Sequence, residues 1–330
     1  MHDWTVTDAD RELFARELAS FVPPRIFDAH AHLYDTAHFA ADKVPALCQA
    51  GPKQTGIRAY LDAIGELTPN RTVGGLFFPF PTTEVDTNAA NEFLSQQVKD
   101  RPLSRGQMLV TPKMDVDFIR QAVRDHRFVG LKCYHVFSPT KPTFDSPIED
   151  FLPEAQAKLA GELGLSITLH MVRSRALADP VNQETIRRYA TRYRGMRLIL
   201  AHAARGFNPH HTIAGIASLR GLENIWFDTS VVTDAGAFEA IIQTMGHKRL
   251  MYGSDFPVSH LRGRCVAIGD SFHWISAENT RLDAAYAKIE LSLVGLESLR
   301  TLKVAARSLR LNDSQVEDIF HNNAAEMFGL

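Results

Sequence analysis

The chain has few cysteines and no excess of charge of either sign, and both features exclude classes of function. Its three cysteines, Cys48, Cys133 and Cys265, are odd in number, far apart and without CxxC spacing. This pattern predicts neither a disulfide framework nor a cysteine-based zinc site, and it favours a reducing, cytoplasmic location. Lys plus Arg (36) nearly balances Asp plus Glu (38), for a net charge of −2. We therefore expect no nucleic-acid partner and no anionic membrane surface as a partner.

Long hydrophobic runs are also missing. No stretch of about 18 or more apolar residues occurs, so no membrane span is expected. The first residues lack a basic segment followed by an apolar run, so no secretory signal is expected either. With 330 residues, 45% of them hydrophobic, the chain can bury a large core in one α/β barrel or in two medium domains.

Residues 1–24 predict an N-terminal helical extension, and we place the main domain at residues 25–330. Thr7 and Asp10 have the spacing of a capping box at the start of a helix. The apolar stripe of that helix consists of Leu13, Phe14, Leu18 and Phe21. Pro23 and Pro24 then end the helix.

Eight short apolar, β-branched or aromatic runs recur along the chain. They cover residues 25–32, 72–80, 106–111, 128–134, 165–171, 197–203, 224–230 and 249–255. Stretches of helical periodicity lie between most of them, at residues 87–99, 115–125, 153–163, 182–193 and 235–245. This alternation predicts an α/β fold, a (β/α)8 TIM barrel. A doubly wound open sheet is the alternative, but no glycine-rich phosphate motif follows any run.

Three segments exceed a minimal barrel. Residues 33–70 predict a long loop with a helical piece near 57–67, and residues 138–147 are rich in proline and serine. The second of these is either a wall or lid of the substrate pocket or a disordered surface loop. Beyond residue 256 the pattern is helical and predicts a C-terminal helical extension over the barrel. Ser314 and Glu317 have the spacing of a capping box for its last helix.

Ligand-type side chains stand at the ends of several predicted strands. His30 and His32 are two apart, so they point to the same side of a strand. The predicted strands that follow end at His170, His202 and Asp255. A lone histidine on a buried strand is more often a hydrogen-bonded core residue than a ligand. A barrel, however, brings all these ends to one rim, and five such groups are hard to explain as packing because unpaired buried polar groups are costly.

These residues resemble the motifs of the amidohydrolase superfamily, in the amidohydrolase-related branch that contains metal-dependent hydrolases and non-oxidative decarboxylases. The resemblance spans about residues 25–330. The similar motifs are Phe27-Asp28-Ala29-His30-Ala31-His32, Leu131-Lys132, Leu169-His170, Ala201-His202, Tyr252-Gly253-Ser254-Asp255-Phe256-Pro257 and the closing segment 321–330.

The resemblance implies a set of site residues. His30, His32, His170 and Asp255 would hold one divalent metal ion, usually zinc, with manganese as the alternative. His202 would contact the substrate or the bound water, and Asp255 would also accept a proton, so these two are the predicted catalytic residues. A bound zinc ion lowers the pKa of its water to about 7, and an adjacent carboxylate can take that proton.

Three cations are candidate substrate contacts. Lys132 corresponds to a lysine that is carbamylated in two-metal relatives and grips substrate in one-metal relatives. We favour one metal with Lys132 as a substrate contact, and a lysine ion-paired at the barrel rim is the plain alternative. Arg173 and Arg205 each follow a predicted site histidine by three residues. Their guanidinium groups suit a substrate carboxylate, and a loop salt bridge is equally open.

Other polar residues are weaker candidates for the site. Asp228 could orient His202 or hold a water molecule, or it could be a plain strand-end carboxylate. His210 and His211 are expected to face solvent on a loop.

The leading hypothesis is a metal-dependent hydrolase that uses metal-activated water to cleave an amide, ester or lactone of a small carboxylate-bearing substrate. The alternative is a metal-dependent decarboxylase, a carbon–carbon lyase, of an aromatic or unsaturated acid. A barrel that binds a small molecule without catalysis is a third reading, which the full set of predicted ligands argues against. A homo-oligomer stays open, since relatives are often dimers or larger.

Overall fold

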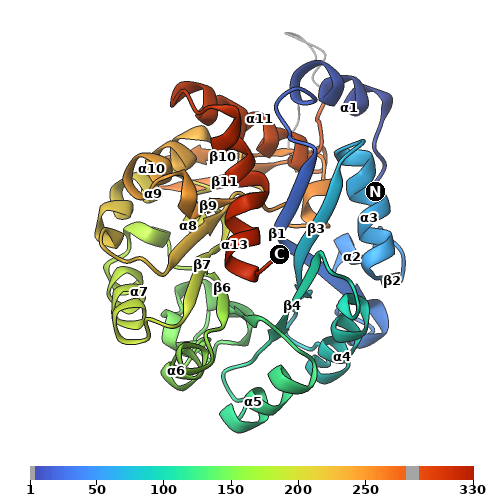
Figure 1. Cartoon of the computed structure of the whole chain (residues 1–330). Coiled ribbons are helices and arrows are strands. Elements are labelled where there is room, and N and C mark those ends of the chain that lie inside the picture. The colour runs from blue at the N-terminus through green and yellow to red at the C-terminus, as the bar shows by residue number, and fades with distance from the viewer. Residues whose placement is uncertain (1–3, 280–289) are drawn as a thin grey trace.

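The computed structural model describes residues 4–279 and 290–330. Its main sheet contains eight parallel strands in the order of the chain (Figure 1). They are β1 (Arg25–Asp35), β3 (Thr72–Pro79), β4 (Ser104–Leu109), β5 (Gly130–Tyr134), β6 (Ser166–His170), β7 (Arg197–Leu200), β8 (Ile225–Asp228) and β9 (Leu250–Met251). Each matches one of the predicted runs. A short antiparallel strand, β2 (Gln54–Thr55), pairs with the end of β1.

The segment after β9 closes the sheet into a barrel. Ala31 forms a parallel bridge with Phe256. The backbone N–H of His32 donates to the carbonyl of Phe256 at 2.8 Å, and that of Ala29 donates to the carbonyl of Tyr252 at 2.8 Å. The barrel prediction is therefore confirmed, and the open-sheet alternative is wrong.

Helices surround the strands (Figure 1). The outer layer includes α3 (Ile57–Leu67), α4 (Thr87–Val98), α5 (Val116–Asp125), α6 (Glu154–Leu163), α7 (Pro180–Arg192), α9 (Pro209–Gly215), α10 (Ala235–Met245) and α11 (Val294–Ser308). Aspartates begin several of them. Asp86, Asp115 and Asp234 each accept hydrogen bonds from backbone N–H groups of the first helical turn, which have no partner within the helix. None of the described helices is long and apolar enough to cross a membrane.

The C-terminal helix α13 (Asn323–Phe328) lies across the amino-terminal end of the barrel (Figure 1). Its Phe328 ring stacks on Phe27 of β1 with centroids 5.6 Å apart, and Ala324 and Met327 join the same apolar cluster. The expected extension over the barrel is present. Its cap differs from the prediction, because Asn312 forms the capping box with Gln315 before α12 (Asp313–Glu317).

The N-terminal helix α1 (Asp8–Leu13) begins with the predicted capping box of Thr7 and Asp10. It continues through a π-helical turn, Phe14–Leu18, whose Phe14 and Leu18 are buried. Asp10 also forms an ion pair of 2.6 Å with Arg262, which follows β9. This pair ties the extension to the segment that follows β9.

A β-hairpin lies where the sequence pattern predicts only helix. Strands β10 (Arg264–Ile268) and β11 (Ser271–Ile275) pair antiparallel around Gly269-Asp270, a dipeptide suited to a two-residue turn. The amide of Asn208 donates to the carbonyls of Gly269 (3.1 Å) and Ser271 (2.8 Å). His211 lies 2.9 Å from Asp270, so it is buried against the hairpin, and the prediction that it faces solvent is wrong.

Candidate active site

The carboxyl ends of the strands surround a cavity of about 420 Å³. Its polar lining consists of His30, His32, His135, His170, His202, Arg205 and Asp255. Its aromatic lining consists of Phe80, Tyr134, Phe144, Phe207, Phe272 and Trp274. Phe272 and Trp274 come from the β10–β11 hairpin and Phe144 from the segment 138–147. The predicted pocket wall at that segment is thus present, although the hairpin wall was missed.

Three predicted ligands converge in this cavity. His30 Nε2 lies 3.3 Å and His32 Nε2 lies 3.2 Å from Asp255 Oδ1. Their ligand atoms all lie within 4.8 Å of one another, and all three residues are buried. The alternation of side chains along β1 places both imidazoles inside the barrel, and closure of the barrel brings Asp255 to them.

Hydrogen bonds fix which nitrogen of each imidazole faces the carboxylate. His30 Nδ1 lies 2.9 Å from Asp228 Oδ2, and His32 Nδ1 lies 3.2 Å from the carbonyl of Pro79, so each Nδ1–H donates to an acceptor. Burial lowers the pKa of both imidazoles, which are therefore neutral and carry a lone pair on Nε2. Apart from the Lys132 ammonium, which lies 3.4 Å from His30 Nε2, lone pairs and a carboxylate oxygen face one another here. Such an arrangement costs free energy unless a cation lies between them. This donor set fits a divalent metal ion.

Two further buried carboxylates organise the ligands. Asp228 accepts from His30 Nδ1–H and also, at 2.8 Å, from the backbone N–H of His202. Burial opposes its ionisation, but the facing His30 holds the pKa of Asp228 well below its usual range. Asp28 accepts from Tyr60, Ser254 and the backbone of His30, and burial raises its pKa to about 6. From the sequence, the role of Asp228 stayed open, and Asp28 had no predicted role beyond its place in the first motif.

His170 and His202 form a hydrogen-bonded pair on the same wall. His202 Nδ1 lies 3.1 Å from the carbonyl of Ser230, and His202 Nε2 lies 3.1 Å from His170 Nδ1. If His202 Nδ1–H donates to Ser230, His170 Nδ1–H donates to His202 and leaves a lone pair on His170 Nε2. Within the part of the chain that the structure describes, His170 belongs to neither group of three close ligand atoms. Its role as a ligand, and that of His202 in catalysis, stay predictions.

An unusual backbone turn holds His202 and Arg205. Residues 202–205 all have positive φ, at 56°, 52°, 61° and 58°, and none of them is glycine. A left-handed turn of this kind costs about 1–2 kcal/mol per residue. It is held by Asp228 at the His202 N–H and by Thr212, whose hydroxyl donates to the Ala203 carbonyl at 3.0 Å. Both His202 and Arg205 line the cavity from this strained turn, as expected of a functional constraint.

Lys132 is fully buried beneath the histidines. Its ammonium lies 3.4 Å from His30 Nε2 and 4.3 Å from the centroid of the Phe78 ring. Burial lowers the pKa of Lys132 to about 8. We find no ion pair for it in residues 4–279 and 290–330, so the rim salt bridge is absent from these residues.

Arg205 and Arg173 have different environments. Arg205 is 8% exposed, and its guanidinium carbon lies 5.1 Å from the Phe272 ring and 5.9 Å from the Phe144 ring. Its one hydrogen bond found among the described residues goes to the carbonyl of Arg173, at 3.0 Å. Arg173 lies outside the cavity lining and forms a 2.9 Å ion pair with Asp179. Arg205 therefore lies at the cavity. Arg173 instead forms a loop salt bridge, which was the alternative to a substrate contact.

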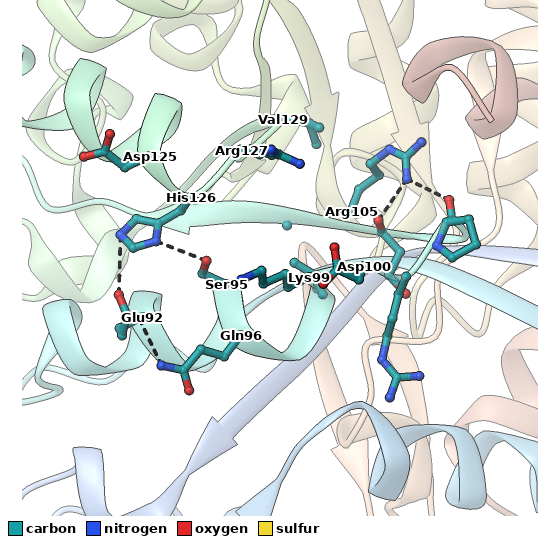
Figure 2. A pocket seen from close by; sticks show the side chains of 15 residues that line it. Glu92, Ser95, Gln96, Lys99, Asp100, Arg105, Asp125, His126, Arg127 and Val129 are labelled. Carbon is teal, nitrogen blue, oxygen red and sulfur yellow. Dashed lines mark hydrogen bonds and ion pairs between the residues drawn. The ribbon is translucent and has the colours of Figure 1, made fainter.

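A larger cavity of about 810 Å³ lies at the opposite end of the barrel (Figure 2). Its walls come from the end of α4, the end of α5 and the starts of β4 and β5. Charged side chains such as Lys99, Asp100 and Arg127 line it, and they are exposed. It contains one imidazole, His126, and none of the converging ligands, so we assign the chemistry to the smaller cavity.

The fold and the site together define a class: an α/β barrel with histidines and a carboxylate converging at the carboxyl ends of its strands. The chain belongs to the amidohydrolase family, whose profile matches residues 27–330. This match confirms the resemblance found in the sequence. The family and its solved neighbours are enzymes that act on small molecules, with both hydrolases and decarboxylases among the neighbours.

Solved structures share the fold at low sequence identity. An amidohydrolase from Burkholderia multivorans with bound zinc superposes with a TM-score of 0.58 at 15% identity, over 92% of this chain and 99% of its own. A probable 2-pyrone-4,6-dicarboxylic acid hydrolase from Acinetobacter baumannii gives 0.56 at 15%, over 92% and 99%. The 5-carboxyvanillate decarboxylase of Sphingomonas paucimobilis gives 0.56 at 15%, over 93% and 100%. No curated protein matches by sequence.

Proposed function

We propose that this protein is a metal-dependent hydrolase that opens an amide, ester or lactone of a small carboxylate-bearing substrate. The observation that carries the proposal is the convergence of His30 Nε2, His32 Nε2 and Asp255 Oδ1 inside a cavity that also holds Arg205. These three residues and His170 would hold one divalent ion, most simply zinc, with manganese as the alternative. When bound, such an ion lowers the pKa of water and polarises a substrate carbonyl.

The protein's own residues would carry out the proton transfers of the reaction. Nearby imidazoles keep the pKa of Asp255 low although burial opposes its ionisation, so its carboxylate is available as a base. It would accept a proton from the attacking water and return it to the leaving group. Asp228 keeps His30 in the tautomer that presents Nε2, and the pair of His170 and His202 would orient the water or the substrate. Lys132, behind His30, would add positive charge close to the substrate.

Arg205 supports the carboxylate part of the proposal. Burying a guanidinium group whose N–H donors lack partners costs free energy, unless an anion accepts the remaining hydrogen bonds. Because Phe144 and Phe272 flank it, the adjoining part of the substrate would be flat and apolar. The free, buried state of Cys48, Cys133 and Cys265 supports a reducing, cytoplasmic location.

Decarboxylation of an aromatic or unsaturated acid is the second candidate. The aromatic lining of the cavity favours it, because an apolar wall suits a planar acid and destabilises a carboxylate that is to be lost as CO₂. The same ligand set would serve either reaction, so only the products separate the two.

One experiment separates these reactions. Zinc-loaded and manganese-loaded protein would be incubated with a panel of lactones, esters, amides and aromatic acids in water enriched in oxygen-18. Hydrolysis predicts one labelled oxygen in the acid product and no CO₂, with turnover lost on chelation and restored by the metal. Release of CO₂ without label in the remaining product would contradict the hydrolase proposal and support the decarboxylase.

Arg205→Met keeps much of the side-chain volume and removes the charge. We expect KM for a carboxylate substrate to rise about tenfold or more, since hydrogen bonds to charged groups contribute about 1.5–3 kcal/mol. Arg173→Met is the matched control, because Arg173 lies outside the cavity lining and should leave KM within about twofold. Equal effects of the two substitutions would show that Arg205 does not bind the substrate.

A further inference from the structure

His135, directly after β5, forms part of the cavity wall although the sequence gave it no role. Its ring lies 4.7 Å from that of Phe144, 4.8 Å from that of Tyr134 and 5.6 Å from that of His170, measured between centroids. Its Nδ1 lies 3.0 Å from the hydroxyl of Thr143, in the segment between β5 and α6. The ring is therefore packed among three aromatic rings and held at one edge by Thr143.

Among the described residues, no hydrogen-bond partner is found for the other edge of the His135 ring. The residue is 4% exposed and lines the cavity, and no hydrogen bond to Nε2 is found within residues 4–279 and 290–330. A buried polar atom is normally hydrogen-bonded to protein, water or ligand. Nε2 is therefore placed to bond to whatever occupies the cavity.

Arg205 defines where an occupant would lie relative to His135. Phe144 contacts the imidazole of His135 on one side, and its ring centroid lies 5.9 Å from the Arg205 guanidinium carbon. An acid held by Arg205 would thus lie in the same cavity as His135 and the His30–Asp255 group. A polar substituent on the body of the substrate, separate from the carboxylate, would meet Nε2.

We propose that His135 is a specificity-determining residue that hydrogen-bonds a hydroxyl group of the substrate, with Thr143 as its positioning residue. The inference rests on the proposed function, because it takes the substrate to be an acid held by Arg205. A hydroxyl suits the site because the Thr143 hydroxyl can donate to Nδ1 or accept from it. Nε2 is a donor in the first case and an acceptor in the second, and a substrate hydroxyl can pair with either.

Ring-substituted benzoates test the proposal directly. The probes are benzoate and 2-, 3- and 4-hydroxybenzoate, with dissociation constants measured by calorimetry on the zinc-loaded protein. We expect at least one hydroxybenzoate to bind about tenfold more tightly than benzoate, which corresponds to one well-placed hydrogen bond. His135→Phe should remove this preference and leave benzoate affinity within about twofold. His135→Gln, which keeps a donor and an acceptor, should restore part of it.

Matched variants separate recognition from structure. Thr143→Val should reduce the preference and Thr143→Ser should keep it, because only the hydroxyl positions the imidazole. His126 is the control: its Nδ1 lies 3.1 Å from the Ser95 hydroxyl in a similar pair at the other end of the barrel (Figure 2). His126→Phe should leave every dissociation constant unchanged.

Two outcomes overturn the inference alone: a wild-type protein that binds benzoate and all three hydroxybenzoates equally, or a preference that survives His135→Phe. Failure of the proposed function looks different. In that case benzoate affinity is unchanged by Arg205→Met, or none of the four acids binds at all, which overturns both proposals.

Discussion

At the scale of single residues, the site depends on which nitrogen each imidazole presents. The acceptors at Nδ1 of His30 and His32 are Asp228 and the carbonyl of Pro79, and they leave both Nε2 atoms facing Asp255. His202 has both nitrogens engaged, one by Ser230 and one by His170. His202 is therefore placed to act through its neighbour His170.

His170→Ala and His202→Ala distinguish a ligand from its partner. If His170 is a ligand, His170→Ala should lower metal affinity by more than about 100-fold and abolish turnover while the fold persists. His202→Ala should lower metal affinity by about 10–100-fold, as loss of a hydrogen-bonded outer partner does. Metal content by mass spectrometry after dialysis, with circular dichroism for the fold, measures both. Full metal occupancy and wild-type activity in His170→Ala would remove it from the ligand set.

Ala204 lies in the left-handed turn at residues 202–205 and is buried with φ at 61°. Substitution by a larger and by a smaller residue should therefore change the stability of the protein by different amounts. Ala204→Val should destabilise the protein by about 2–4 kcal/mol, because a β-branched side chain adds strain and overpacking. Ala204→Gly should be nearly neutral, since relief of about 1 kcal/mol of strain offsets the loss of a buried methyl group. Urea denaturation measures both. Equal destabilisation by the two would argue against strain in this turn.

At the scale of elements, two additions to the barrel depend on polar contacts with distant segments. The β10–β11 hairpin is attached to the start of α9 through Asn208 and His211, and it carries Phe272 and Trp274 into the cavity. The N-terminal helix α1 is attached through Asp10 and Arg262. Both contacts join parts of the chain that no local pattern connects.

The pair of Asp10 and Arg262 predicts a pH dependence of stability. Burial opposes ionisation of Asp10, but hydrogen bonds from Arg262 and Thr7 lower its pKa below 3.8 in the folded state. The stabilisation is therefore present above about pH 4 and is lost as pH falls through the folded-state pKa. Asp10→Asn should cost about 2 kcal/mol of unfolding free energy at pH 6 and much less at pH 2.5. A cost that is the same at both pH values would contradict this linkage.

At the scale of the whole molecule, a bound ion would link β1, β6 and the segment after β9, which closes the barrel. Metal binding should therefore stabilise the entire fold. Zinc at about 100 times its dissociation constant would add about 2.7 kcal/mol. For a chain of this size that corresponds to roughly 4 °C in the melting temperature.

Calorimetric melting with and without a chelator checks this effect. The chelator should lower the melting temperature of the wild-type protein and leave that of His30→Ala unchanged. A wild-type melting temperature that does not respond to chelator or to added zinc would argue against an ion at the His30–Asp255 group.

The sequence alone determined the barrel and the rim of histidines. Strand periodicity, helical periodicity and the alternation of the two are local properties, so all eight strands and the chief helices were predictable from the residues themselves. The position of His30, His32, His170, His202 and Asp255 at strand ends then followed, because parallel strands of a barrel share one carboxyl end.

Only the tertiary structure decided which partners these residues have. Asp228 is an ordinary strand residue until closure of the barrel places it against His30. Asp28 is next to His30 in its own strand, but its partners Tyr60 and Ser254 come from distant parts of the chain. Arg173 and Arg205 have the same spacing from a histidine, yet one pairs with Asp179 and the other faces the cavity. The Gly269-Asp270 turn is a local signal for the hairpin that the helical interpretation of this segment overlooked. The place of the hairpin and of His135 in the cavity wall comes instead from contacts between separate segments, and such contacts leave no periodic pattern in the sequence.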